Sequence, residues 1–444
     1  MFSLRFLILA ALLAAPLFSQ ETLTLNEAWH IARDNNLTLQ QIEKSILQAN
    51  EEIEIRRAAY LPSLDASGSF FYISDIPNLQ LPINLPDGPA AFTPDLRDWY
   101  NFSLGLSQPI FTGFRTKNLV KSARERHQAS IVEKDAAQNK LFLEVGVLFY
   151  DLQLNMIQQN VLQESIRRAD IQLQNARNLF LADQSAAFDT LEAANRKLML
   201  QTELLAIENA FDNKRIKFRH LLNVAEPIAI ERAAVTPSST IAGSLEENLV
   251  IAANQRPELQ QLGALQKAQL YQGNAAESAF YPQIFANLSM NTLLPGISFL
   301  EQKWTSFFVV SVGFQWNIWN WKQDHRRVQQ SRLEMNKLDL QTRQILQNIR
   351  QQVTEVHQLL QNTREQIHLQ KQLVAQQKER YRIASALYQE GQVTNLDISA
   401  AETALTESEL RLQQSYIRWQ QLRLQLDFAT GSLGKHLDQP ASAQ

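Results

Sequence analysis

The 444-residue chain contains no cysteine. This absence excludes disulfide frameworks, zinc–thiolate sites, iron–sulfur clusters and thiol nucleophiles. It also excludes the lipid-attachment cysteine of a bacterial lipoprotein. The 42 Lys and Arg residues nearly balance the 45 Asp and Glu residues, so the net charge of −3 gives no overall basic footprint for nucleic acid.

Glycine and proline are scarce, with 13 and 14 residues. Proline is absent between Pro109 and Pro227, and again between Pro295 and Pro440. Both stretches are rich in residues that favour helices, such as Gln, Leu, Ala and Glu. They predict two very long helices, at about 114–182 and 322–390, each roughly 100 Å long at 1.5 Å per residue.

The chain also lacks a long interior hydrophobic run, because no interior stretch reaches the roughly 18 apolar residues of a spanning helix. Residues 1–19 differ from the rest, since Arg5 precedes an apolar run from Phe6 to Phe18. This pattern is typical of a secretory signal peptide, and we expect cleavage after Ser19. The mature protein should therefore leave the cytoplasm.

The two halves of the chain resemble each other. Leu25–Gln41 (LNEAWHIARDNNLTLQQ) aligns with Leu245–Gln261 (LEENLVIAANQRPELQQ) at an offset of 220, and Asp189 falls on Asp397 at an offset of 208. Separate anchors that agree in this way indicate an internal duplication. We predict a first repeat at 20–223, a second repeat at 224–435 and a C-terminal tail at 436–444.

Apolar residues recur every seven positions along the second long helix. A sustained seven-residue repeat predicts coiled-coil packing with a left-handed supercoil. Five of the six equivalent positions in the first long helix are also apolar, so both helices should form the wall of a tube. The positions in the second helix are Leu346, Val353, Leu360, Ile367, Val374, Tyr381 and Tyr388.

Four short segments alternate apolar and polar residues with period two, and the apolar positions are even-numbered. In the last segment, Phe308 and Val310 interleave with Ser311. The alternating part of each segment has about 9 to 11 residues, the length of a strand that crosses a bilayer when tilted. We predict strands at about 63–74, 99–111, 283–292 and 304–318, two in each repeat.

Five of the seven tryptophans lie in or next to these segments. Two aromatic bands at opposite ends of an apolar strip fit the girdles of a membrane β-barrel. A soluble β-sandwich is the alternative, but two hairpins between such long helices have no second sheet to pack on. We expect these side chains to face lipid or form the girdles: Trp99, Phe102, Leu104, Trp304, Val310, Phe314, Trp316 and Trp319.

Four strands cannot close a barrel, since barrels need about eight or more and an open edge in lipid leaves backbone groups unpaired. The chain must therefore oligomerise. Three copies would supply twelve strands and two copies eight, and twelve leave more room for a lumen.

Several motifs together resemble the TolC family of outer-membrane efflux proteins. They are the strand starts YLPSL and FYPQI, SQPIFTGFR with its partner FQWNIWNWKQ, and the helix turn YQEGQVTNLDISAAETAL. The resemblance implies a mostly α protein with a trimeric 12-stranded β-barrel that continues as a periplasmic α-helical barrel. It also implies docking to a periplasmic adaptor and an inner-membrane pump.

The resemblance further implies a gated tip at the two helix turns. The second turn keeps Tyr388, Gly391 and Asp397, whereas the first has Asp183 in place of the glycine and Asp189 in place of the second aspartate. In a trimer, three copies of Asp397 would form a negative ring that draws cations. The alternative role of Asp397 is a charge at a helix N-terminus.

Two positions depart from the family pattern at this tip. Ala400 stands where some members have a second acidic residue, and Val393 offers no charge for a lock of basic and acidic pairs. The sequence therefore gives no support for such a lock.

No catalytic constellation is present. The seven histidines are scattered, and there is no G-x-S-x-G motif, phosphate loop or paired-carboxylate cleft. His357 and His368 lie eleven residues apart without the dense set of ligands that a metal site needs. We predict a protein that is not an enzyme and has no cofactor, no metal and no nucleic-acid partner.

We predict a passive exit duct in the outer membrane, with helices extending into the periplasm, that serves a tripartite efflux or type I secretion system. Its partners would be two further copies of itself, an adaptor, a pump and membrane lipid. One alternative is a periplasmic coiled-coil adaptor, which should have one hairpin flanked by Gly-rich β-domains. Another is a structural envelope protein, against which the alternating strands argue. Drug, metal and protein cargoes all remain open.

Overall fold

The structure is a computed structural model. It describes residues 22–75, 79–85, 88–92, 97–226, 228–231, 243–297 and 303–434. The signal peptide predicted at 1–19 and the tail predicted at 436–444 lie outside these residues.

Contacts divide the chain into two compact units, and each unit draws on both sequence repeats. Unit 1 comprises Met1–Gln40, Asp135–Arg256 and Asn348–Gln444, and unit 2 comprises Gln41–Lys134 and Pro257–Gln347. The compact units therefore do not coincide with the two repeats, because both repeats contribute equivalent segments to each unit.

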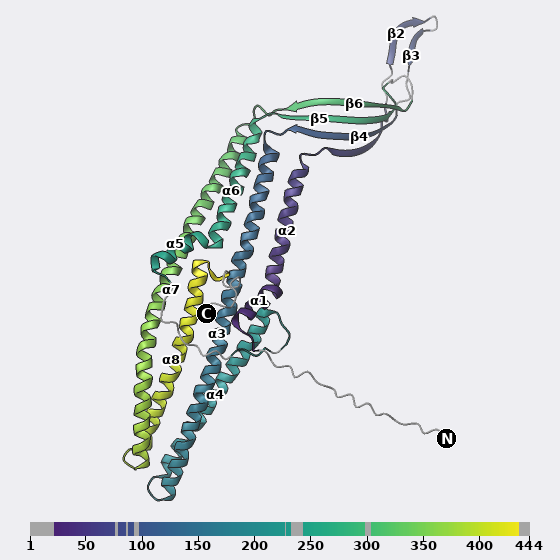
Figure 1. Cartoon of the computed structure of the whole chain (residues 1–444). Coiled ribbons are helices and arrows are strands. Elements are labelled where there is room, and N and C mark those ends of the chain that lie inside the picture. Colours follow the sequence, from purple (N-terminus) through teal and green to yellow (C-terminus); the bar gives the residue numbers. More distant parts are fainter. Residues whose placement is uncertain are drawn as a thin grey trace, which may run out of the picture. The chain divides into compact units, whose positions relative to one another are not determined.

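The helices confirm that the chain is built from two structural repeats (Figure 1). The long helices α3 and α7 have 67 residues each, and the helices that follow them, α4 and α8, have 36 each. Every boundary of α7 and α8 lies 208 positions after its counterpart. The bounds are α1 Leu25–Asn35, α2 Leu37–Ala58, α3 Arg115–Leu181, α4 Ala187–Leu222, α5 Leu245–Gln255, α6 Pro257–Glu277, α7 Gln323–Gln389 and α8 Asn395–Thr430.

Reciprocal capping boxes explain where α1 and α5 begin. Thr24 and Glu27 cap α1, and Ser244 and Glu247 cap α5 at the equivalent place in the second repeat. In each box the hydroxyl accepts from the backbone N–H three residues later, while the carboxylate accepts from the backbone N–H of the cap. Within the described residues, no helix has both the length and the apolar character needed to cross a membrane.

In unit 1, α1, α3, α4 and α8 share one hydrophobic core. The indole Nε1 of Trp29 donates to the carbonyl oxygen of Phe142 at 2.9 Å, so the buried ring has a polar partner. Gly146 lets α3 approach α8 closely, because a Cβ atom there would lie 2.3 Å from Leu424 Cδ2. The predicted heptad positions Val353 and Leu360 on α7 are also buried, as a packed coiled-coil seam requires.

In unit 2, polar contacts join the helices in pairs. The Ser122 hydroxyl of α3 donates to the carbonyl oxygen of Ala268 in α6 at 2.8 Å. The Gln269 amide of α6 donates to the Ser331 hydroxyl of α7 at 3.0 Å. These contacts place α6 between the first parts of α3 and α7.

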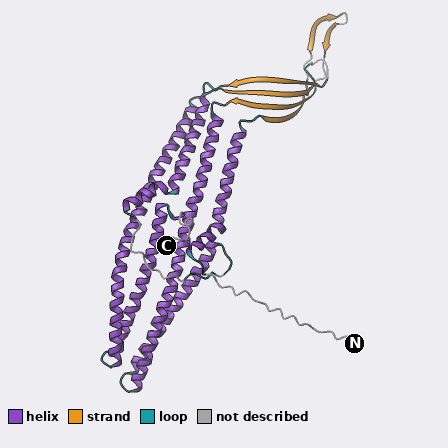
Figure 2. Ribbon diagram, viewed as in Figure 1, coloured by secondary structure: helices purple, strands orange, loops and turns teal. Residues whose placement is uncertain are grey.

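Unit 2 also carries a four-stranded antiparallel sheet (Figure 2). The strand order is β1-β4-β5-β6, so each repeat contributes one hairpin and the two hairpins meet at β4 and β5. A separate antiparallel pair, β2 with β3, lies in the segment that connects β1 to β4. The bounds are β1 Ser63–Tyr72, β2 Leu79–Leu85, β3 Gly88–Phe92, β4 Asp98–Phe111, β5 Gln283–Leu294 and β6 Thr305–Gln315.

Three predicted strand ends differ from the structure. The third strand ends at Leu294, two residues later than predicted. The fourth strand, expected to reach residue 318, ends at Gln315. Gln315 pairs with Gln283, the first residue of β5, so the residues after Gln315 have no partner strand in the part of the chain that the structure describes. The first strand ends at Tyr72, two residues earlier than predicted.

Candidate functional site

The apolar side chains of the sheet gather on one face. In the pairings of β1 with β4 and of β5 with β6, even-numbered residues oppose even-numbered residues, for example Leu288 opposite Val310. The even-numbered side chains of β6 are largely exposed, at 76% for Phe308, 68% for Val310, 74% for Val312 and 74% for Phe314. A contiguous exposed apolar face of this kind marks a surface that contacts lipid or another protein.

Among the described residues, the sheet has two free edges, one on β1 and one on β6. A free edge presents unpaired backbone N–H and C=O groups, which favour pairing with another strand. Because each edge has the same even-numbered apolar face, further strands could continue the sheet without burying polar side chains in lipid.

Aromatic side chains mark both ends of the apolar face. At the end near the interstrand connections, the Trp304 ring lies 5.9 Å from Tyr100 and 6.1 Å from Phe102, measured between ring centroids. Beyond the other end of β6, the rings of Trp319 and Trp321 lie 5.9 Å apart. Predicted girdle residues Trp99 and Trp316 are also exposed, at 37% and 49%.

In unit 1, the two helix turns have the same backbone conformation. Gly391 has φ of 71° and Asp183 has φ of 54°, both in the left-handed region. At each turn, the N–H of the following residue donates to a carbonyl five residues earlier, at 2.9 Å from Gln392 and 2.8 Å from Gln184. The first turn therefore has an aspartate where the second has a glycine. Aspartate tolerates the left-handed conformation better than most residues.

Asp397 forms a capping box at the start of α8. One carboxylate oxygen accepts from the Thr394 backbone N–H at 2.9 Å and from the Thr394 hydroxyl at 2.6 Å. These hydrogen bonds lower the pKa of Asp397 below its usual value. The side chain is nevertheless exposed, so the cap leaves its charge accessible to solvent.

The other predicted tip residues lie where the two helix pairs meet. Asn395 of α8 donates to the backbone carbonyl of Asp189 at 3.1 Å and to the Glu192 carboxylate at 3.3 Å, both on α4. Tyr388 is only 4% exposed. Burial raises the pKa of the Tyr388 hydroxyl, and the nearby charges of Asp189 and Glu192 raise it further.

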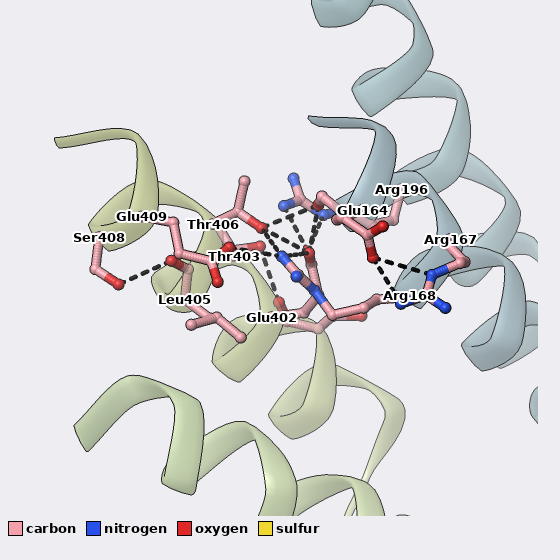
Figure 3. Close-up of polar contacts among 12 residues, drawn as sticks. Glu164, Arg167, Arg168, Arg196, Glu402, Thr403, Leu405, Thr406, Ser408 and Glu409 are labelled. Carbon is pink, nitrogen blue, oxygen red and sulfur yellow. Dashed lines mark hydrogen bonds and ion pairs between the residues drawn. The ribbon is translucent and has the colours of Figure 1, made fainter. Parts of the chain in front are cut away.

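A buried ionic network joins the helix pairs beside these turns (Figure 3). The Glu402 carboxylate of α8 is fully buried and pairs with Arg196 of α4 at 2.8 Å and with Arg168 of α3 at 3.4 Å. Arg168 also pairs with Glu409 at 3.2 Å. Its guanidinium lies 5.9 Å from the centre of the Tyr381 ring, so the network reaches α7 as well.

Burial by itself would raise the pKa of Glu402, but its partners reverse that effect. The hydroxyls of Ser165 and Thr406 and the guanidinium of Arg196 donate to the carboxylate, and together they hold the pKa of Glu402 below its ordinary value. The charged form of the carboxylate is therefore the one that fits this site.

Sequence reasoning missed this network because it looked for charged pairs at Val393 and Ala400. The sequence does contain a signal for this network, because its three charged residues differ from their counterparts in the other repeat. The counterparts of Arg168, Arg196 and Glu402, at an offset of 208, are the uncharged residues Gln376, Ala404 and Ala194. Within the described residues, no group of three or more His, Asp or Glu side chains is placed to hold a metal ion.

An exposed apolar sheet in the same chain as paired helices of 67 and 36 residues is typical of a membrane channel. The chain belongs to the outer membrane efflux protein family, whose model matches residues 28–224 and 248–432. The predicted family resemblance is therefore confirmed. The family assignment makes the protein an efflux channel of the outer membrane and not an enzyme.

Solved structures share this fold. CusC, a transmembrane channel, is 19% identical with a TM-score of 0.78, and the match covers 92% of each chain. The outer membrane protein VceC from Vibrio cholerae is 15% identical with a TM-score of 0.73, covering 92% of this chain and 96% of VceC. The CmeC outer membrane channel of Campylobacter jejuni is 14% identical with a TM-score of 0.74, covering 92% and 86%. No significant match was found among curated proteins.

Proposed function

We propose that three copies of this protein form a twelve-stranded barrel, which serves as the outer-membrane exit duct of a tripartite efflux or type I secretion system. The observation that carries the proposal is the four-stranded sheet, which has free edges on β1 and β6 and an exposed apolar face. Pairing β6 of one copy with β1 of the next would satisfy both edges, and three copies would close the ring.

Disulfide cross-linking tests this assembly cleanly, because the natural chain has no cysteine. Ala66→Cys on β1 is combined in turn with Val310→Cys and Val312→Cys on β6, so that more than one pairing register is sampled. We expect oxidation of membranes to give covalent dimers and trimers on non-reducing gels. A single monomeric band in every combination, with the protein in the membrane fraction, would contradict the proposal.

The matched control places both cysteines within one chain. Leu104 of β4 lies opposite Met290 of β5. Leu104→Cys with Met290→Cys should therefore give only intrachain bonds and no ladder of covalent oligomers.

The duct passes cargo that an inner-membrane pump delivers through a periplasmic adaptor, which binds near the turns at Asp183 and Gly391. Support comes from the family assignment and from the exposure of both turns. A cross-linker introduced at Gln184→Cys in intact cells should capture the adaptor, whereas the same cross-linker at Gln341→Cys on α7 should not. Equal capture at both positions would argue against docking at the turns.

Asp397 supplies the charge of this channel's narrow end. Its carboxylate caps its own helix yet remains exposed, so three copies could also present a negative ring to cations. Asp189, the counterpart in the first repeat, is half-buried, and its backbone carbonyl already accepts from Asn395. Asp189→Ala should therefore change cation selectivity less than Asp397→Ala, as measured by reversal potentials in planar bilayers.

A further inference from the structure

A basic pocket lies in unit 2 where the sheet gives way to α7. It has a volume of about 670 Å³ and is bounded by the 3₁₀ turn η1, Ser278–Phe280, and by the first turns of α7. The side chains that matter for its chemistry are Glu277, Phe280, Lys322, His325, Arg326 and Arg332.

The charge in this pocket is not balanced by the protein. Glu277 is the one acidic residue among those that line the pocket, and its carboxylate pairs with Arg332 at 3.7 Å. The nearby Asp324 is buried and accepts from Arg327 at 3.2 Å and from Asn320. Among the described residues, neither Lys322 nor Arg326 has an acidic partner, so two positive charges face the pocket.

The backbone beside the pocket is strained. Trp321 and Lys322 have φ of 56° and 64°, in the left-handed region that bulky side chains rarely adopt. In the first repeat, the same two positions are Gly113 and Phe114, with φ of 60° and 66°. The second repeat therefore keeps the turn with a tryptophan in place of the glycine and with a cation after it. Strain of this kind clusters at functional sites such as ligand clamps.

The surroundings of the pocket point to a membrane surface. The residues between β6 and α7 expose large apolar side chains, at 77% for Ile318, 65% for Trp319 and 86% for Trp321. Tryptophan concentrates at the head-group level of membranes, because its ring is apolar and its N–H is polar. The pocket thus lies at the end of the apolar sheet face, beside residues suited to the head-group layer.

We propose that this pocket binds the phosphate of an anionic membrane phospholipid, with Lys322 and Arg326 as the phosphate-binding residues. The oxygens of a phosphate can accept paired hydrogen bonds from an arginine guanidinium and a further one from a lysine ammonium. Phe280, whose ring lies 4.8 Å from that of His325, gives the glycerol part an apolar wall. The corresponding positions of Lys322 and Arg326 in the first repeat are Phe114 and Asn118, so the first repeat lacks this pair of cations. The proposal rests on the proposed function in one respect, since it requires the sheet to lie in the membrane.

Native mass spectrometry of the detergent-solubilised protein, titrated with phosphatidylglycerol or phosphatidylcholine, tests the site. We expect phosphatidylglycerol to bind more tightly. In Lys322→Gln/Arg326→Gln, its apparent Kd should rise by roughly 25-fold, about fivefold for each cation removed at a membrane surface. The control Lys337→Gln/Arg343→Gln removes the same charge from exposed residues of α7 that pair with Glu334 and Asp339. Its Kd should change less than about twofold.

Three results would overturn the inference. They are equal Kd values for the two lipids, equal losses in the two double variants, and displacement of phosphatidylglycerol by millimolar inorganic phosphate, which would indicate a site for free phosphate. The trimer and its conductance are measured on the same preparations. A conducting trimer without lipid preference would refute only the lipid site, whereas failure to insert or to form trimers would refute the proposed function.

Discussion

Glu402→Gln tests how strongly the buried network holds the helix pairs together. Glutamine keeps the size of the side chain but removes its charge. Arg196, whose side chain is 17% exposed, then loses its acidic partner among the described residues. Removing one member of a buried pair costs about 3–5 kcal/mol, because the remaining charge stays desolvated. We expect a loss near the lower end, since Arg168 retains Glu409 at 3.2 Å.

The assay is equilibrium unfolding in urea of the detergent-solubilised protein, followed by far-UV circular dichroism. Arg167→Gln is the control, because Arg167 lies next to Arg168 but pairs with Glu164 at the surface, with side chains 72% and 57% exposed. Such a pair contributes at most about 1 kcal/mol. Equal losses of unfolding free energy in the two variants would refute the reasoning.

The effect of Glu402→Gln should also depend on pH in a defined direction. The pKa of Glu402 is lowered in the folded protein, whereas an unfolded glutamate has a pKa of about 4.3. A lowered pKa contributes stability that is present above the unfolded value and is lost as the pH falls through the folded value. The difference between wild type and variant should therefore be constant near neutral pH and shrink below about pH 4. A difference that grows on acidification would contradict this assignment.

Three further predictions concern the sheet, the core and the tip. Val310→Arg should cost roughly 2–4 kcal/mol on a lipid face and impair assembly, as measured by gel filtration. Ser311→Arg should mainly change single-channel conductance. If the two variants change assembly and conductance equally, the assignment of the lipid face is wrong. Gly146→Ala would place a methyl group 2.3 Å from Leu424 Cδ2 and should cost about 1–3 kcal/mol of unfolding free energy. Leu424→Ala should then cost less unfolding free energy in the Gly146→Ala background than in the wild type, because it removes the overlap. Asp397→Ala should weaken cation selectivity and block by divalent cations in planar bilayers without preventing trimer assembly, and unchanged selectivity would leave only the helix cap as its role.

Much of the architecture could be predicted because the duplication is visible in the sequence. The offsets of 220 and 208 locate equivalent helices, and the structure places their ends at the same offsets, except that the end of α6 lies 219 positions after the end of α2. Proline-free stretches predicted the long helices because proline interrupts helical hydrogen bonding. Period-two alternation predicted the exposed face, since side chains on a strand alternate between its two faces.

The network around Glu402 could not be predicted in the same way. Isolated charges on a long helix usually face solvent, and the sequence does not tell which faces of α3, α4 and α8 meet. Arg167 and Arg168 are neighbours in sequence, yet one is exposed and the other is 16% exposed within the network. The end of β6 was also beyond a sequence argument, because it depends on where the partner strand begins.

The two turns at Asp183 and Gly391 share a backbone conformation but carry different side chains. In the proposed trimer they would form a ring of six loops with alternating chemistry, ADQSAA from one hairpin and EGQVTN from the other. A partner that engages all six loops alike would have to recognise their common main-chain shape. A partner that reads side chains would find three equivalent places, each spanning one loop of each kind.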